Sequence, residues 1–496
     1  MSVHNVIAID LGASSGRLMH IGQQGSQMKM NEIYRFSNEG IRVGGRTYTD
    51  IFHIYHEILQ GLKKAVHEMG VIDGIGIDTW GHDFAILDRE GELMRIPYQY
   101  RDSQSQGMID EADCIFGKKR LFELTGSKDF WCNTIYQILG IRKRNGSILD
   151  EGTDMLMIPD FIVYLLTGTK TGESTSASLT QMYDVSKNKW SGEILEKIGM
   201  QKEMMPKILP HGAVKGFLSE DILAAIGAPK DRKIPVINIA EHDTAAAAYA
   251  APTDSEQYVF ISSGTWSIIG TILPQPVISD VVYEGGFSNE GAAYGKIKLT
   301  QTIMGMWFVQ ELRKVWERKE LNTDYDYLIA EAEASVPFCR FIDVEDDLFR
   351  SPYDMESAIN SYLSKTGQPI AKTQGEFYRT VMESLAYAYR HSIDRLAELT
   401  GYDPEAVYFL GGAARDTMFC QFIADATGRK LVAGPVEATA VGNALMQIES
   451  FADCEEEEIR GLRLNAEVTC YQPRNSAIWQ ENYKRFYDVT ASGKVG

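Results

Sequence analysis

The stretch at residues 6–17, VIAIDLGASSGR, constrains the fold of this chain more than any other. An apolar run that ends at Asp10 indicates a buried strand, and the Gly and Ser residues after it indicate a tight turn before a second strand. Such a turn can point backbone N–H groups at an anion. A carboxylate beside a phosphate is repulsive unless a divalent cation lies between them. The stretch therefore suggests Mg²⁺ and a nucleotide phosphate.

A second turn of the same kind, SSGTWS at 262–267, follows another apolar strand far downstream. Either turn by itself is also what an ordinary Gly/Ser hairpin contains. Two such turns, one in each half of the chain, are more specific for phosphate binding than either alone.

The length and charge of the chain narrow its class. A chain of 496 residues is too long to fold around a single hydrophobic core, so we expect two large domains. We place them at residues 1–251 and 252–490. The net charge of −19 argues against a nucleic-acid or anionic-membrane partner. It does not argue against ATP, because backbone amides, local cations and Mg²⁺ hold phosphates.

The cysteines and the first residues indicate a cytoplasmic protein. Six scattered cysteines include no C-x-x-C pair, so zinc or thioredoxin-type chemistry is not indicated, and free thiols are expected. The chain runs straight into its first strand, which leaves no room for a secretory leader. We find no apolar stretch of transmembrane length.

Alternating strand and helix patterns predict an α/β chain. The clearest helix covers 51–69, capped by Asp50 or Thr49 and ended by Gly70. Other expected elements are an edge strand at 28–36, strands at 74–78, 234–240 and 338–344, a long helix at 374–399 and a last helix at 437–448. We also expect a hairpin at 84–91 and a mostly helical region over 104–230.

Two short polar segments follow predicted strands. Strand 234–240 leads through Glu-His-Asp-Thr into an Ala-rich helix, which places Asp243 at a helix N-terminus. There an Asp is stabilised as the anion and is available as a proton acceptor, although helix capping is its commoner role. The segment Trp-Gly-His-Asp at 80–83 suits a sugar, or equally a hairpin with a half-buried Trp.

Several motifs together resemble the FGGY carbohydrate kinases, which belong to the actin, hexokinase and heat-shock chaperone superfamily. They occur in family order over nearly the whole chain: DLGASSGR, IDTWG at 77–81, FWCNTIYQ at 130–137, AEHDTAAA at 240–247, SSGTWS, the pair Gly411-Gly412 and AGPVEAT at 433–439. The resemblance implies two actin/hexokinase-like (ribonuclease H-like) domains flanking a central ATP/sugar cleft. It also implies phosphoryl transfer from ATP to a sugar. The P-loop and protein-kinase motifs are absent from the sequence.

The resemblance also implies roles for matching residues. Asp243 would be the general base, and Asp10 would position Mg²⁺ through water. Gly81, His242, Asp243, Thr244 and Thr302 would bind the sugar. The residues implied for ATP are Ala13, Ser14, Ser15, Gly16, Arg17, Thr265, Gln310 and Gly412.

The match is strongest to members that phosphorylate the ketose L-rhamnulose to L-rhamnulose 1-phosphate in L-rhamnose catabolism. Thr302 replaces a family Asn that contacts sugar, so another ketose, L-fuculose or L-xylulose, is an alternative. Ala413 and Asp416 also depart from the family, at the adenosine side. A non-catalytic sugar or nucleotide sensor is a further alternative. Monomer and homodimer both remain open.

Overall fold

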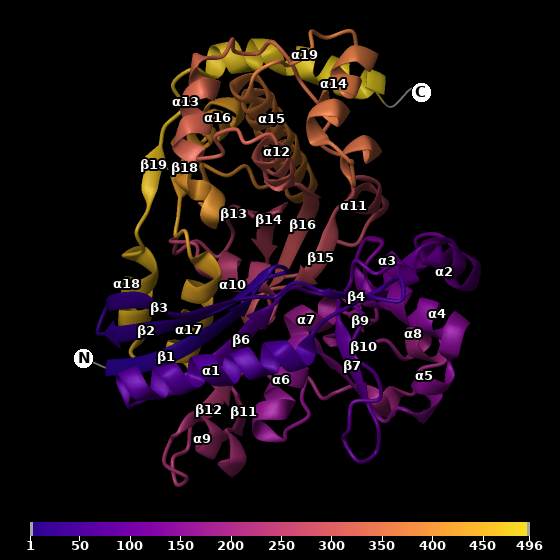
Figure 1. The fold of residues 1–496 in the computed structure, drawn as a ribbon, viewed down its shortest axis with the longest axis vertical. Coiled ribbons are helices and arrows are strands. Elements are labelled where there is room, and N and C mark those ends of the chain that lie inside the picture. Colours follow the sequence, from indigo (N-terminus) through magenta and orange to yellow (C-terminus); the bar gives the residue numbers. More distant parts are fainter. Residues whose placement is uncertain (1–2, 494–496) are drawn as a thin grey trace. The chain divides into compact units, whose positions relative to one another are not determined.

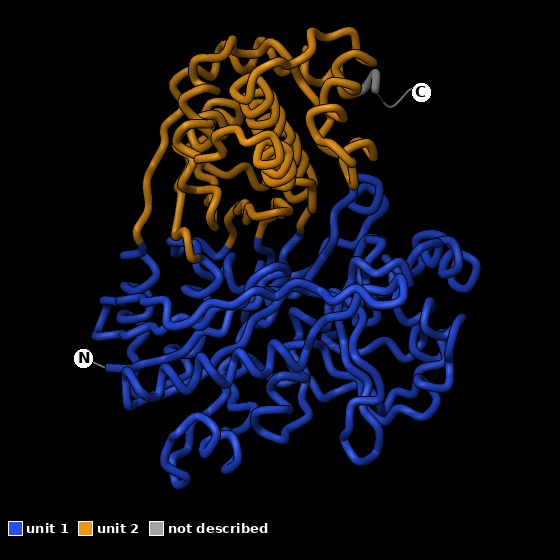
Figure 2. Tube along the Cα trace, in the orientation of Figure 1, with its two compact units in different colours: residues 1–256, 272–299, 438–466 blue, residues 257–271, 300–437, 467–496 orange. Residues whose placement is uncertain are grey.

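The computed structural model describes residues 3–493, with side chains to residue 490, and divides them into two compact units (Figures 1 and 2). Unit 1 comprises residues 1–256, 272–299 and 438–466. Unit 2 comprises residues 257–271, 300–437 and 467–496. Each unit contains a sheet and helices, as the predicted α/β class requires.

A six-stranded sheet forms the centre of unit 1. Its order is β11 (Val214–Phe217), β12 (Pro235–Ile237), β6 (Gly74–Thr79), β1 (Val3–Leu11), β2 (Ser15–Gln24) and β3 (Gln27–Ser37). β1 and β6 are parallel and almost wholly buried, which explains their unbroken apolar runs. β3 lies at the edge, as predicted. The register sets Asp10 opposite both Asp78 and Arg17.

Helix α1 (Ile51–Met69) confirms its predicted bounds. The Asp50 side chain accepts a hydrogen bond from the His53 N–H, and Gly70 ends the helix with φ = 72°. Its apolar face packs into the unit 1 core through Ile51, Ile54, Ile58, Leu62 and Ala65.

The rest of unit 1 contains short strands and helices. β7 (Phe84–Leu87) pairs along its length with β8 (Asp154–Met157), which the sequence did not reveal, although the turn after β7 forms as expected. The other strands are β4 (Ile41–Val43), β5 (Arg46–Tyr48), β9 (Tyr183–Asp184), β10 (Lys189–Trp190) and β15 (Ser288–Gly291). The helices of the 104–230 region are α2 (Met108–Phe116), α3 (Arg120–Thr125), α4 (Thr134–Asn145), α5 (Ser147–Glu151), α6 (Ile158–Thr167), α7 (Ser174–Ser178), α8 (Gly192–Lys197) and α9 (Glu220–Ile226).

Two helices of unit 1 pack closely. α17 (Ala438–Glu449) lies against α10 (Asp243–Tyr249), β1 and β6. At Gly442 a Cβ would stand 1.8 Å from the carbonyl oxygen of Ala246, so only glycine permits this approach. Unit 1 also holds α11 (Asp280–Glu284) and α18 (Glu456–Leu464).

Unit 2 contains most of a seven-stranded sheet. The strands follow the order β15, β16 (Ile297–Met304), β14 (Trp266–Leu273), β13 (Val259–Ser263), β17 (Ala406–Leu410), β18 (Lys430–Ala433) and β19 (Thr469–Tyr471). The predicted long helix is α15 (Gln374–Thr400), started by a capping box between Thr373 and Glu376. Its other helices are α12 (Trp307–Arg318), α13 (Tyr325–Ala334), α14 (Met355–Lys365), α16 (Thr417–Thr427) and α19 (Ser476–Gly493).

Two expectations for the second half of the chain are wrong. Residues 338–344 form no strand, because the N–H groups of Phe338, Phe341 and Ile342 donate to side chains of Glu383, Gln368 and Ser384 instead of a neighbouring strand. The helix expected as the last, now α17, is followed by α18 and α19. No helix among the described residues is long and apolar enough to cross a membrane.

Candidate active site

The first turn joins β1 and β2 as predicted. The Gly12 N–H donates to the Ser15 carbonyl at 2.9 Å. Asn38 ties the turn to β3, because its backbone N–H donates to the Ser14 carbonyl at 3.0 Å and its side chain to the Gly12 carbonyl at 2.8 Å. Ala13, Ser14 and Ser15 keep solvent exposure. The turn is therefore braced from one side and accessible at its tip.

Gly16 is buried behind this turn. A Cβ there would lie 2.2 Å from the ring of Phe36, so close packing also requires this glycine.

Asp10 and Arg17, expected to serve metal and phosphate, contact each other. The Arg17 Nε and Nη2 atoms donate to Asp10 Oδ2 at 2.9 and 2.7 Å. The pair bridges β1 and β2 directly behind the turn. Asp10 is 6% exposed, so this is a largely buried ion pair at the strand end.

Asp78 is a carboxylate for which the sequence suggested no role. It lies beside Asp10 on β6, is fully buried, and accepts a hydrogen bond from the Asn443 amide of α17 at 2.6 Å. Burial, and then the charge of Asp10, raise the pKa of Asp78 well above its usual value. The only signal in the sequence was its place at the end of a buried strand.

Asp243 is the first residue of α10, with His242 as the N-cap. Its side chain retains 34% exposure, and the Thr244 hydroxyl donates to its Oδ1 at 3.0 Å. Burial, followed by the charge of Asp10, raises the pKa of Asp243 to about 6. The helix N-terminus favours the Asp243 anion, as expected of that position, whereas burial and the like charge of Asp10 favour the protonated form. A carboxylate with this pKa is suited to general-base work near neutral pH.

Neutral and cationic groups surround this carboxylate. His242 Nε2 lies 3.3 Å from Asp243 Oδ1, and burial lowers the pKa of His242 well below its usual value. Its buried Nδ1 has no hydrogen-bond partner among the described residues. Lys298 of β16 is fully buried in contact with Glu290, and burial lowers the pKa of Lys298 to about 7 against the opposing charge of Asp243. No motif in the sequence pointed to Lys298.

The segment at 77–83 is tightly packed, so its aromatic ring is not free to stack against a sugar. Trp80 is 8% exposed and its Nε1 donates to Asp83 Oδ2 at 2.9 Å, so the indole does not offer an open face. A Cβ at Gly81 would lie 2.3 Å from Leu179. His82 adopts φ = 81°, and burial lowers its pKa to about 4.

The residues expected to bind nucleotide in unit 2 lie on several elements. The Thr265 hydroxyl, in the turn between β13 and β14, donates to Gln310 Oε1 of α12 at 3.1 Å. A Cβ at Gly412 would meet no described atom within 4 Å, so the backbone there is open to approach. Asp416 caps α16 by accepting from the Phe419 N–H at 2.9 Å. Thr302, which was expected to bind the sugar rather than the nucleotide, is half-buried on β16.

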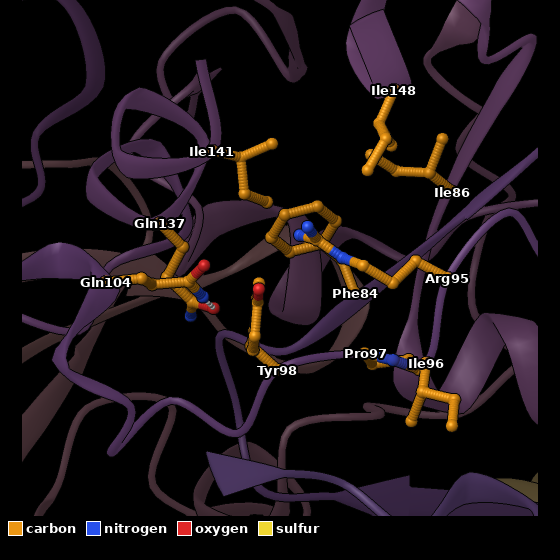
Figure 3. Close-up of a pocket in the computed structure, with 10 residues that line it drawn as sticks. All are labelled: Phe84, Ile86, Arg95, Ile96, Pro97, Tyr98, Gln104, Gln137, Ile141 and Ile148. Carbon is orange, nitrogen blue, oxygen red and sulfur yellow. Dashed lines mark hydrogen bonds between the residues drawn. The ribbon is translucent and has the colours of Figure 1, made fainter. Parts of the chain in front are cut away.

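A small pocket lies elsewhere in unit 1 (Figure 3). The guanidinium of Arg95 stacks on the Tyr98 ring at 4.2 Å, and Gln104 donates to Gln137 Oε1 at 3.0 Å. None of the predicted site residues lines it. Its lining residues are Phe84, Ile86, Arg95, Ile96, Pro97, Tyr98, Gln104, Gln137, Ile141 and Ile148.

The fold matches solved sugar-kinase structures over their full length. A xylulose kinase from Lactobacillus acidophilus superposes with a TM-score of 0.82 at 15% identity, covering 99% of both chains. A glycerol kinase from Plasmodium falciparum, solved with ADP, superposes with a TM-score of 0.80 at 14% identity over 98% of both chains. These superpositions establish a shared actin/hexokinase-like fold. At such low sequence identity they establish nothing beyond the fold.

The sequence itself matches known families and relatives. A rhamnulokinase from Bacteroides thetaiotaomicron is 36% identical, covering 97% of this chain and 98% of that protein. A rhamnulokinase from Klebsiella pneumoniae subsp. pneumoniae is 33% identical, covering 95% of each. Residues 5–250 match the N-terminal domain model of the FGGY family of carbohydrate kinases, and residues 259–450 match its C-terminal domain model. The chain therefore belongs to the FGGY family of carbohydrate kinases.

Proposed function

We propose that the chain transfers the γ-phosphoryl group of ATP to L-rhamnulose and forms L-rhamnulose 1-phosphate. The observation that carries this proposal is the similarity to proteins named rhamnulokinase over at least 95% of both chains, at 33–36% identity. An ATP-dependent carbohydrate kinase is what the family implies. The alternative of a non-catalytic sensor has no observation in its favour.

In the proposed reaction Asp243 accepts the proton of the sugar hydroxyl as that oxygen attacks the γ-phosphorus, while the bond from the γ-phosphorus to the β,γ-bridging oxygen breaks and ADP leaves. Its exposed fraction and near-neutral pKa support this role. His242, Thr244, Gly81 and Thr302 orient the sugar. The backbone and side chains of residues 13–17, with Thr265, hold the phosphates, while Gln310 and Gly412 serve the adenosine. Phosphoryl transfer needs mainly such positioning and charge neutralisation from the protein.

Asp10 fits a water-mediated Mg²⁺ site. The described residues contain no group of three His, Cys, Asp or Glu side chains placed to hold a metal by themselves. Mg²⁺ usually keeps several waters and binds through one or two carboxylates and the substrate phosphates, so one carboxylate beside the first turn is enough. When bound, the ion would neutralise charge on the phosphates.

We also retain 1–251 and 252–490 as the two family domains, which the spans of the family models support, although the compact units assign residues 272–299 and 438–466 to unit 1. The cytoplasmic location and the state as monomer or homodimer stay predictions.

Sugar identity is tested with a panel of substrates. We expect kcat/KM to be highest for L-rhamnulose among L-rhamnulose, L-fuculose, L-xylulose, L-ribulose and glycerol, measured by ADP release, with ³¹P NMR locating the phosphate on O1. Thr302→Asn restores a longer donor and acceptor and should raise kcat/KM for L-rhamnulose without changing the order. A wild type that prefers another sugar of the panel contradicts the substrate proposal and leaves the kinase assignment standing.

A further inference from the structure

The two residues before Asp243 are held by the side chains of Thr175 in α7 and of Glu173, the N-cap of α7, which lies far earlier in the chain (Figure 1). The Glu241 N–H donates to Glu173 Oε2 at 3.3 Å, and the His242 N–H donates to Thr175 Oγ1 at 3.0 Å. Both N–H groups precede α10, so this helix offers them no acceptor. The backbone that leads into the proposed base therefore depends on Glu173 and Thr175.

Glu173 is itself firmly held. It is fully buried and accepts hydrogen bonds from the Thr175 N–H and hydroxyl, both at 2.6 Å, and from the Ser176 N–H at 2.9 Å. Burial raises the pKa of Glu173, whereas hydrogen bonds from His211 and Thr175 lower it below its usual value. These hydrogen bonds favour the Glu173 anion.

His211 fixes Glu173 from a third segment. Its Nδ1 accepts from the Tyr294 N–H at 2.8 Å, which assigns the ring proton to Nε2. Nε2 then donates to Glu173 Oε1 at 2.6 Å. The carboxylate consequently has little freedom to rotate away from the Glu241 N–H.

Glu241 is also held through its carbonyl and through one oxygen of its carboxylate. Its carbonyl accepts from the Thr79 N–H at 2.8 Å. Its carboxylate contacts Lys215 Nζ at 2.5 Å, and Lys215 contacts Asp160 at the same distance, with all three side chains buried. The turn before Asp243 is thus anchored to β6, α6, α7 and β11.

We propose that Glu173 and Thr175 are positioning residues for phosphoryl transfer, fixing the backbone of 241–242 so that the Asp243 carboxylate meets the sugar hydroxyl in a reactive orientation. The proposal rests on the proposed role of Asp243. Both side chains are fully buried, so neither acts on substrate directly. The sequence analysis did not single out either residue. A misplacement of about 1 Å in a reacting group can cost roughly 10²-fold in rate.

Thr175→Val tests the link to the His242 N–H, because it removes the hydroxyl at nearly constant volume. We expect kcat to fall about 10- to 100-fold, with KM for ATP essentially unchanged, and Thr175→Ser to restore most of the rate. Thr125→Val is the matched control. Thr125 is equally buried, donates to the Leu121 carbonyl at 2.7 Å and accepts from the Ser127 N–H at 3.2 Å. A similar effect of the two Val variants on kcat overturns the proposal.

A double-mutant cycle separates positioning from general damage. If Thr175 acts through Asp243, Thr175→Val should cost nothing further in an Asp243→Asn background. An equal loss in both backgrounds overturns the proposal. Should Thr175→Val fail to fold, Glu173→Gln keeps the side-chain shape, and the same pattern is expected from it. A fully active Asp243→Asn single variant would instead overturn the proposed base itself, a result that is separable because it does not involve α7.

Discussion

Opposing interactions set the pKa of the Asp243 carboxylate. Hydrogen bonds from Thr244 and the charge of Lys298 favour the anion, whereas burial and Asp10 favour the acid and prevail. We expect Asp243→Asn to lower kcat by about 10²–10⁴-fold, because the amide cannot accept the hydroxyl proton. Steady-state turnover with saturating ATP and sugar measures this, and ATP affinity by calorimetry should be unchanged. A variant within a few-fold of wild type excludes Asp243 as the base.

The pH dependence of kcat/KM for the sugar follows from the same carboxylate. A base works only when deprotonated, so kcat/KM should rise with pH and level off above about 6, the pKa of Asp243 in the free protein. Below that value kcat/KM should fall about tenfold per pH unit. The measurement is a pH profile of kcat/KM for the sugar at fixed Mg²⁺ and ATP. A flat profile between pH 5 and 7, as a rough window, contradicts the assignment.

Asp10 offers a different test at the residue scale. We expect Asp10→Ala to raise the Mg²⁺ concentration needed for half-maximal activity, because the carboxylate nearest the first turn is lost. Binding of sugar alone should change little. Titration of Mg²⁺ at fixed ATP measures the first effect and calorimetry the second. Superimposable Mg²⁺ curves for variant and wild type remove Asp10 from the metal role.

At the scale of elements, the contact of α17 with α10 depends on Gly442. A methyl group there collides with the Ala246 carbonyl, a backbone atom that cannot rotate away. We expect Gly442→Ala to destabilise the protein by about 1–3 kcal/mol, as overpacking typically does. Urea unfolding followed by fluorescence measures the loss. The control is Gly192→Ala in α8, where a Cβ meets nothing within 4 Å and stability should not fall.

Elements with strong local signals were predicted from the sequence. α1 and α15 were recovered nearly to the residue, because apolar spacing, caps and a terminal glycine all lie within the helix. The segment 338–344 was mispredicted from its apolar residues, since its backbone partners are side chains of distant residues. β8 was missed because its partner β7 lies far away in the sequence.

For the whole molecule, the net charge of −19 has a direct consequence. Phosphate backbones and anionic lipids repel such a protein on close approach, within the Debye length of about 8 Å at physiological ionic strength, beyond which salt screens the repulsion. We expect no binding to duplex DNA in gel shifts and no co-sedimentation with vesicles containing phosphatidylserine. Retention on either, at micromolar protein, contradicts the expectation.

The sequence by itself determined the two phosphate-type turns, the strand-to-helix placement of Asp243 and, through ordered motifs, the family. These features depend on residues close together in the chain, where backbone preference and spacing act directly. Only the tertiary structure decided which charges surround Asp243 and what holds it. Asp78 meets Asn443, and Glu173 meets Glu241, across long stretches of sequence. Burial and long-range contacts set these pairings and the pKa of Asp243, and no local pattern encodes either.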